Sequence, residues 1–132
     1  MTGSALRPPS RRRRELQSIA AELFAAHGFA NVTVDDIGGA AGVSGPALYH
    51  HFDGKEALLG EMLIEVSQQL LEGGRRIRAS SSDFLPTLVR FHCEFAVDPA
   101  SLITVQFRDL ICATASDRRR VRYLQGRYVA IW

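Results

Sequence analysis

Two pairs of neighbouring residues carry the side chains best suited to chemistry, His50 with His51 and His92 with Cys93. Histidine and cysteine can bind a metal, or act as base and nucleophile when a third group orients them. Both pairs lie in segments with helical patterning, where adjacent side chains point about 100° apart. Because they diverge and no further acid, base or ligand is spaced to join them, the sequence predicts no catalytic site, no metal and no cofactor. An enzyme is the disfavoured class.

Contact with a phosphate backbone is the chemistry better suited to residues 44–52. Ser44 is a good N-cap for a short helix with proline in its first turn. Leu48 and Phe52, four residues apart, can anchor one face of this helix in a core. The remaining surface carries Gly45, Pro46, Ala47, Tyr49 and His50. Small residues let a helix approach a partner closely, and a tyrosine hydroxyl is a natural donor to phosphate.

Two earlier helices must position that surface. Apolar residues of 11–27 recur at helical spacing, and Gly28 is a helix stop. Thr33 and Asp36 form the pattern of a capping box that opens a helix over 34–41, which Gly42 ends. Val32 and Ile37 fit the two positions of a hydrophobic staple. Three helices with a tight turn at 41–44 predict a helix-turn-helix unit.

The rest of the chain also has helical patterning. Asp53 and Glu56 predict the start of a long amphipathic helix that stops at Gly73 and Gly74. Further helices are expected over 83–97, about 100–114 and 117–132, with Pro99 as a breaker. No alternating strand pattern of useful length appears, so the fold class is all-α. The expected organisation is a disordered leader (1–10), a DNA-binding domain (11–70) and a partial regulatory helical domain (71–132).

Bulk composition limits the alternatives. The 132 residues suit about one domain, and the formal net charge of +2 is too small for binding to nucleic acid by charge alone. The arginines at 11–14 either contact phosphates or the minor groove, or belong to a solvated leader. Cys93 and Cys112 are expected to be free thiols. With no signal peptide and no apolar run of about 18 residues, the sequence predicts a cytoplasmic protein without a membrane partner.

Several of these segments together resemble the TetR family of bacterial transcriptional regulators. The resemblance covers about residues 11–70 and is carried by HGF at 27–29, TVDDI at 33–37, AAGVS at 40–44, LYHHF at 48–52 and KEALL at 55–59. It implies a regulator, usually a repressor, that binds double-stranded DNA at a palindromic operator as a homodimer. A small molecule bound among the C-terminal helices would release it.

The resemblance also implies roles for single residues. Thr33 resembles the phosphate contact at the start of the second helix, and Lys55 the phosphate contact at the start of the fourth. The recognition helix would begin with Ser44, Gly45, Pro46 and Ala47, and Tyr49 and His50 would touch the backbone or base edges. Because Gly45 and Ala47 carry no hydrogen-bonding side chain, few bases should be read directly, and DNA shape would supply the remaining specificity.

A candidate effector site lies further along the chain. Phe91, His92, Phe95 and Phe107, with Val105 and Ile111, would line an apolar pocket in which His92 is the polar group. The same stripe is also typical of a plain core, which is the favoured interpretation. A small hydrophobic effector, such as a lipid or acyl derivative, would suit these residues.

Members of the TetR family typically continue with two further long helices, which form most of the dimer interface and close the ligand cavity. Here the sequence ends within a helical pattern at 128–132. The expectation is therefore a fragment or a naturally truncated product, for which dimerisation and effector control are in doubt. The alternative function is a weak DNA binder, a heterodimer partner or a non-functional product.

Overall fold

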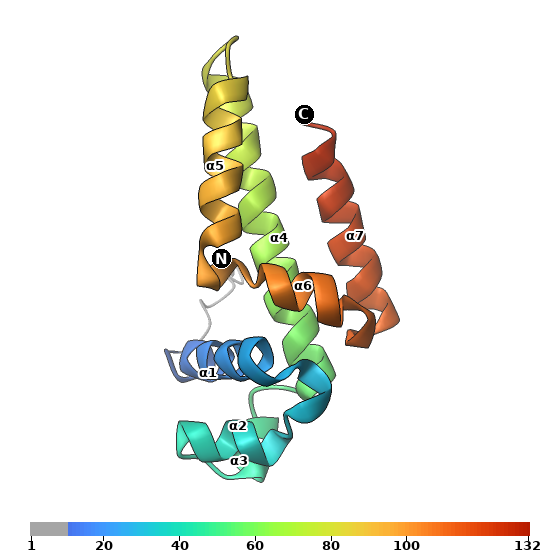
Figure 1. Ribbon diagram of the computed structural model, residues 1–132. Coiled ribbons are helices and arrows are strands. Elements are labelled where there is room, and N and C mark those ends of the chain that lie inside the picture. Colours follow the sequence, from blue (N-terminus) through green and yellow to red (C-terminus); the bar gives the residue numbers. More distant parts are fainter. Residues whose placement is uncertain (1–10) are drawn as a thin grey trace, which may run out of the picture.

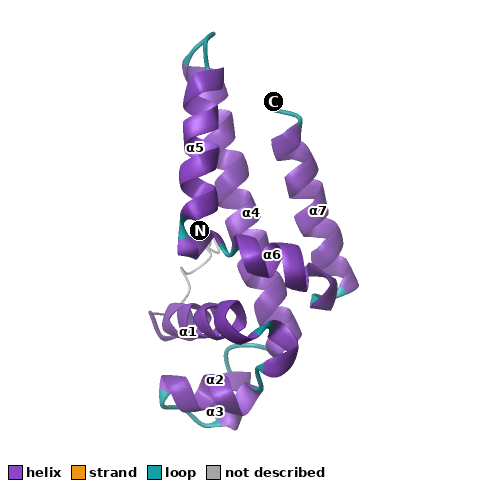
Figure 2. Cartoon of the chain, in the orientation of Figure 1, coloured by secondary structure: helices purple, strands orange, loops and turns teal. Residues whose placement is uncertain are grey.

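A computed structural model describes residues 11–132, and in this part of the chain helices and loops account for the whole fold, with no strand (Figures 1 and 2). The elements in order are α1 (Arg11–His27), η1 (Phe29–Asn31), α2 (Val34–Ala41), α3 (Gly45–Tyr49), α4 (Lys55–Ser80), α5 (Leu85–Val97), η2 (Pro99–Ser101), α6 (Ile103–Asp109), η3 (Leu110–Cys112) and α7 (Ala115–Val129). The predicted all-α class is confirmed. The expected leader, 1–10, lies outside the described residues.

Helices α1, α2 and α3 form a small head at one end of the long α4 (Figure 1). The predicted stops are confirmed, because Gly28 and Gly42 both have positive φ, 84° and 72°, a conformation that glycine adopts without steric cost. The staple residues Val32 and Ile37 are both buried in the core of the head. Local signals for caps and stops therefore determine where the helices of the head begin and end.

Helix α4 differs from its prediction at both ends. It begins at Lys55 after Gly54, with no side-chain cap, so Asp53 is not the N-cap. It also continues through Gly73 and Gly74 to Ser80. A β-carbon at Gly73 would overlap the ring of Phe91, and one at Gly74 would lie 2.9 Å from Cε2 of Tyr128. These glycines are thus places where neighbouring helices approach α4 closely, rather than a helix stop.

Small residues at intervals of seven form the face of α4 that packs on α7. A β-carbon at Gly60 would overlap the side chain of Asp117, near the start of α7, and Gly74 meets Tyr128 near its end. Ser67, midway between the two glycines, is buried. A seven-residue spacing keeps the three residues on one helix face. The two helices consequently pack closely along much of their length.

The hydroxyl of Ser67 is buried and has no hydrogen-bond partner among the described residues. We expect Ser67→Ala to raise the unfolding free energy by about 1 kcal/mol, because it removes a desolvated polar group and alanine is the better helix former. Thermal unfolding checks this, with Ser80→Ala as a control, since the hydroxyl of Ser80 donates to the carbonyl of Ile77. An equal or lower stability of Ser67→Ala would contradict the expectation.

The segment expected as one helix over 100–114 is divided into η2, α6 and η3. Pro99 starts η2, and Leu102 takes a left-handed conformation, with φ 55°, between η2 and α6. That backbone conformation interrupts a continuous helix. Helix α5 begins at Leu85 rather than Asp83, because Phe84 holds the N-cap position and Pro86 lies in the first turn.

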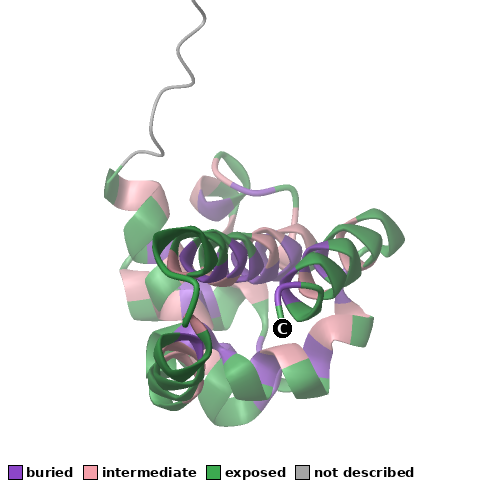
Figure 3. Ribbon diagram, turned by 90° about the horizontal axis from the view of Figure 1, so that it is seen from above, coloured by how far each residue is buried: buried purple, intermediate pink, exposed green. Residues whose placement is uncertain are grey.

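Two clusters of buried side chains form the core. The first unites the head with the near part of α4, with α6 and with Val121 of α7, and the second joins the far parts of α4, α5 and α7. Seen from above, buried residues line the faces where these helices meet (Figure 3). The predicted boundary between residues 70 and 71 falls inside the continuous helix α4, and the division into two domains stays a prediction.

An apolar stripe on α6 and η3 faces outward. Ile103, Phe107 and Ile111 follow one another at four-residue spacing and are 46%, 95% and 74% exposed. The spacing places them on one side of the helical path. Phe107 therefore belongs neither to the plain core that the sequence favoured for this stripe nor to the alternative, a pocket with Phe91, His92 and Phe95. The reason is the break at Leu102, which sets the orientation of α6 independently of α5.

Candidate nucleic-acid interface

Four of the predicted contact residues lie around one hollow at the outer end of the head. Thr33, Gly45, Pro46 and Tyr49 line a cavity of about 410 Å³ with Val34 and Asp35. Tyr49 is 55% exposed, so its ring and hydroxyl are accessible to a partner. Ser44, Ala47 and His50 belong to the same short helix or its caps. Leu48 and Phe52 are buried, which confirms their predicted role as anchors.

Hydrogen-bonded caps fix the start of both helices at this hollow. The hydroxyl Oγ of Ser44 accepts from the amide of Ala47 (3.2 Å) at the start of α3. The predicted capping box of α2 is complete, since Oγ1 of Thr33 accepts from the amide of Asp36 (3.0 Å) and Oδ2 of Asp36 accepts from the amide of Thr33 (2.9 Å). Hydrogen bonds from the Thr33 backbone and side chain lower the pKa of Asp36 below its usual value.

A carboxyl group with a lowered pKa in the folded state stabilises the protein above its usual pKa of 3.8. The stabilisation is lost as the pH falls through the lower, folded value. We expect Asp36→Asn to remove this contribution, so that the variant loses less stability than the wild type when the pH is lowered from about 5 to 3. Urea unfolding at each pH measures the difference. Asp53→Asn is the control, and equal slopes for wild type and Asp36→Asn would contradict the assignment.

Lys55 occupies the start of α4 as expected, but its ammonium group is engaged within the protein. Nζ donates to the carbonyls of Phe29 (2.9 Å) and Val32 (2.8 Å) and lies 4.1 Å from the centre of the Phe29 ring. An ammonium has three N–H groups, so these bonds use two of them. Lys55 thus fastens the loop before α2 to α4, and its contact with phosphate stays a prediction.

Two of the arginines in the first turn of α1 have structural contacts that the sequence did not indicate. Arg12 donates to the carbonyl of Ala41 (2.8 Å) at the end of α2. Arg13 donates to the carbonyl of His51 and to Glu61 of α4, where one contact is 2.6 Å, and its guanidinium lies 4.3 Å from the centre of the Phe52 ring. These side chains hold the last residue of α2 and the segment just after α3 against α1.

Gly38 is a positioning residue of the site that the sequence patterns did not single out. It is buried in α2, and its carbonyl accepts from the amide of Val43 (2.8 Å) in the turn before α3. A β-carbon at Gly38 would lie 2.7 Å from the carbonyl oxygen of Val43. A glycine inside a helix costs up to about 1 kcal/mol relative to alanine, and this cost is the signal that could have identified it. Gly38 sets how closely the turn packs on α2.

A charged joint connects α6 to the end of α1. Arg108 donates to the carbonyl of Phe24 (2.6 Å), and Asp109 accepts from Arg108 (2.9 Å) and from the amide of Phe29 (3.3 Å). Asp109 is only 6% exposed. The hydrogen bond with Asp109 raises the pKa of Arg108, so the guanidinium of Arg108 keeps its charge. Sequence patterns contain no sign of this contact, because it joins residues about 80 positions apart in the chain.

The other effector-site candidates lie on α5. Phe91 packs against Gly73 of α4, and its ring centre is 6.2 Å from that of Phe95. Nδ1 of His92 lies 2.9 Å from the hydroxyl of Tyr128 on α7, and the two rings are stacked. Burial raises the pKa of Tyr128, so its hydroxyl keeps its proton. The polar side chains of this region, His92 and Tyr128, therefore form a hydrogen-bonded pair that joins α5 to α7.

Residues 11–132 contain no group of three or more histidine, cysteine or carboxylate side chains that could hold a metal. Within the same range both cysteines are free thiols, Cys93 exposed and Cys112 partly buried. No helix in the described part of the chain is long and apolar enough to cross a membrane.

Similarity to known proteins is strongest over the head. Residues 18–62 match the family described as bacterial regulatory proteins, tetR family. The HTH-type transcriptional repressor KstR2 of Rhodococcus jostii is 47% identical over 79 residues, which are 60% of this chain and 39% of the relative. The chain thus spans well under half of the length of this curated relative.

Solved structures extend the similarity to nearly all of the fold. A TetR-family transcriptional regulator from Bordetella parapertussis is 26% identical with a TM-score of 0.86, and the match covers 92% of this chain and 65% of that one. The ketosteroid transcriptional regulator KstR2 of Mycobacterium tuberculosis is 27% identical with a TM-score of 0.78, over 92% of this chain and 62% of its own. The chain therefore matches the tetR family of bacterial regulatory proteins over residues 18–62, and beyond that segment its fold is similar to those of TetR-family regulators.

Proposed function

We propose that the protein is a transcriptional repressor that binds a palindromic DNA operator through α3 and is released by a small hydrophobic effector. The observation that carries the proposal is the exposed surface of the head, where Thr33, Gly45 and Tyr49 surround one hollow. A short helix with small residues at its start can enter the major groove closely. Similarity to KstR2, an HTH-type transcriptional repressor, supports the same function.

Thr33 and Tyr49 are proposed to position the head by contacts with phosphate, and His50 to contact base edges. A tyrosine hydroxyl on an exposed ring is suited to a phosphate oxygen, whereas the imidazole of His50 can donate to or accept from a base. A bacterial regulator that acts on DNA works in the cytoplasm, and this is the location that we propose for the protein. The expected assembly on a palindrome is a homodimer, because a two-fold site matches a two-fold protein.

A hydrophobic effector is supported by the aromatic residues of α5. Phe91 packs on α4 with Phe95 as its neighbour, and His92 forms a hydrogen-bonded pair with Tyr128 of α7. The ketosteroid regulator of the same fold supports an apolar effector with a few polar atoms. Such a molecule would suit a pocket that is mainly apolar with few polar groups.

Selection from a randomised duplex pool tests DNA binding and identifies the operator in one experiment. We expect the 132-residue protein to enrich a palindromic sequence, with an affinity that falls steeply as salt rises. Sedimentation of the complex then gives the number of protein chains per duplex. A pool without enriched sequences, or binding that is equal for all duplexes, would overturn the proposal.

Two substitutions separate positioning from base readout. We expect Tyr49→Phe to weaken binding to all sequences about tenfold for each protein chain bound, as one lost hydrogen bond to a charged phosphate per chain implies. His50→Ala should instead relax the preference at one or two positions of each half-site, by about 1–3 kcal/mol per position. Repeating the selection with each variant measures both effects. A changed base preference for Tyr49→Phe, or an unchanged preference for His50→Ala, would contradict the assigned role.

A further inference from the structure

A second hollow lies where the head meets the body, and none of its lining residues comes from α2 or α3. It is a groove of about 410 Å³ between α1, α4 and the segment around η2. Its apolar lining consists of Ala21, Ala25, Met62, Val66, Pro99, Ala100 and Leu102. This volume is within the range typical of small-molecule sites.

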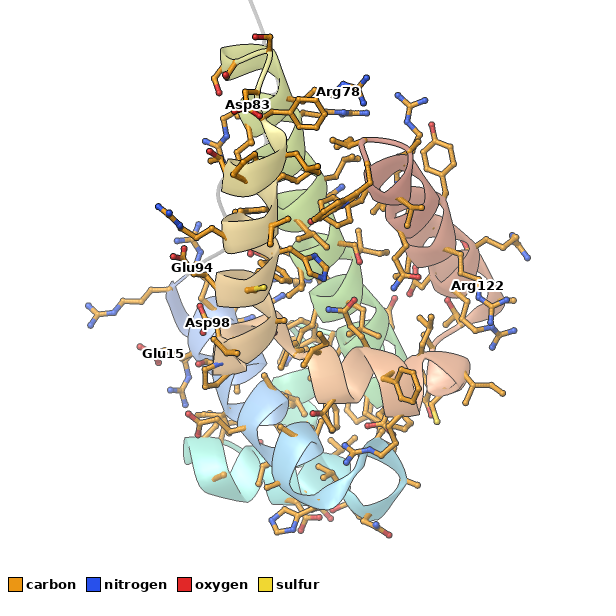
Figure 4. All side chains as sticks on the ribbon, turned by 45° about the horizontal axis from the view of Figure 1, so that its top comes forward. Glu15, Arg78, Asp83, Glu94, Asp98 and Arg122 are labelled. Atoms are coloured by element: carbon orange, nitrogen blue, oxygen red, sulfur yellow. The ribbon has the colours of Figure 1, made fainter. Side chains whose placement is uncertain are left out.

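The charged side chains of this groove all have the same sign. Glu22 of α1 and Glu65 of α4 line it, and both are exposed. In the part of the chain that the structure describes, neither carboxylate forms an ion pair, and no arginine, lysine or histidine is among the lining residues. Glu94 of α5 and Asp98, the residue that follows this helix, lie on the same side of the molecule as α1, opposite Arg122 (Figure 4). The groove is therefore an acidic site on a chain with a net positive charge.

The backbone at one wall of the groove is strained. Leu102 lines the groove with φ 55° and is the one non-glycine residue among 11–132 with a positive φ. For a residue with a branched side chain this conformation costs on the order of 1 kcal/mol. Strained residues of this kind persist where surrounding contacts enforce them, and they are concentrated at ligand sites. The side chain of Leu102 is 8% exposed, so burial in the core holds it in place.

We propose that this groove binds a small amphipathic organic cation, with the apolar body against Ala21, Met62 and Val66 and the positive charge between Glu22 and Glu65. A cation gains from two carboxylates that have no internal partner, whereas an anion would be repelled by both. Because the walls belong to α1 on one side and to α4 and η2 on the other, an occupant fastens the head to the body. Binding is measured without DNA, so failure of this proposal and failure of the proposed repressor function are distinguishable.

A pair of ions with nearly the same shape and opposite charge provides the test. Tetraphenylphosphonium and tetraphenylborate are titrated separately into the protein, with calorimetry for affinity and amide NMR shifts for location. We expect the phosphonium ion to bind roughly tenfold more tightly than the borate, as two partly screened carboxylates imply, and to shift resonances of α1 and η2. Equal binding of the two ions would overturn the proposal.

Matched variants locate the site. Glu22→Gln combined with Glu65→Gln should weaken phosphonium binding roughly tenfold and leave borate binding no weaker. Glu72→Gln is the control, because Glu72 is also exposed on α4 but does not line the groove. Ala25→Leu, which fills the groove from an exposed position, should weaken binding of the phosphonium ion without loss of stability. Wild-type phosphonium affinity in the double variant, or shifts confined to His92 and Tyr128 between α5 and α7, would refute the assignment.

Discussion

Gly38→Leu is expected to lower the unfolding free energy by about 3 kcal/mol and to abolish sequence-selective DNA binding. The β-carbon alone would lie 2.7 Å from the carbonyl oxygen of Val43, and the rest of the leucine side chain needs space that the turn already fills. A backbone carbonyl in a tight turn cannot move aside as a flexible side chain can. The turn, and with it α3, must therefore shift away from α2.

The neighbouring glycine supplies the control for this experiment. A β-carbon at Gly39 meets nothing within 4 Å, so Gly39→Leu adds an exposed side chain to the same helix. We expect Gly39→Leu to be neutral or to stabilise the head by up to about 1 kcal/mol, because glycine is the poorer helix former. Urea unfolding and the operator titration, performed on both variants, check the contrast. Equal unfolding free energies and operator affinities for the two leucine variants would show that the close contact at Gly38 contributes neither to stability nor to DNA binding.

Asp109→Ala is expected to have the second largest effect, because it opens the joint between α6 and α1. The substitution leaves the buried amide of Phe29 without its acceptor, which corresponds to a loss of about 2 kcal/mol in unfolding free energy. It also removes the carboxylate partner of Arg108, which then keeps its hydrogen bond to the carbonyl of Phe24. With α6 held less firmly to the end of α1, we expect weaker operator binding as well.

Two further variants make the test of the joint specific. Asp109→Asn keeps an oxygen that can accept from the amide of Phe29 but removes the charge that holds Arg108, so we expect an intermediate loss. Asp83→Ala removes an exposed aspartate from the loop between α4 and α5, far from the joint (Figure 4), and should change nothing. Thermal unfolding measures the stability of each variant, and a salt-dependent DNA titration measures its affinity for the operator. Equal stability of Asp109→Ala and Asp83→Ala would rule out a structural role for the joint.

The helices of the head could be predicted from sequence because their signals are local. The capping box of Thr33 and Asp36 and the stops at Gly28 and Gly42 involve residues at most a few positions apart, and the structure confirms them. The same short segments contain Thr33, Gly45 and Tyr49, which the sequence predicted as contact residues and which the structure brings together around one hollow. These features depend on backbone geometry within a turn or two.

The features that could not be predicted from the sequence depend on contacts between distant parts of the chain. Gly73 and Gly74 have the residue type of a helix stop, and only the positions of Phe91 and Tyr128 reveal them as sites of close packing. The ammonium of Lys55 turns inward because the carbonyls of the loop before α2 lie within its reach. Sequence periodicity contains no information about such long-range pairs.

The position of Lys55 gives the molecule a built-in chemical reporter. It is the one lysine in the 132-residue sequence, and its amine holds the loop before α2 against α4 through two carbonyls. Amine-reactive acylation followed by mass spectrometry therefore reads out a single side chain besides the N-terminus. The rate of acylation measures how often this contact opens, so binding of DNA or of a cation can be followed at this contact without any substitution in the sequence.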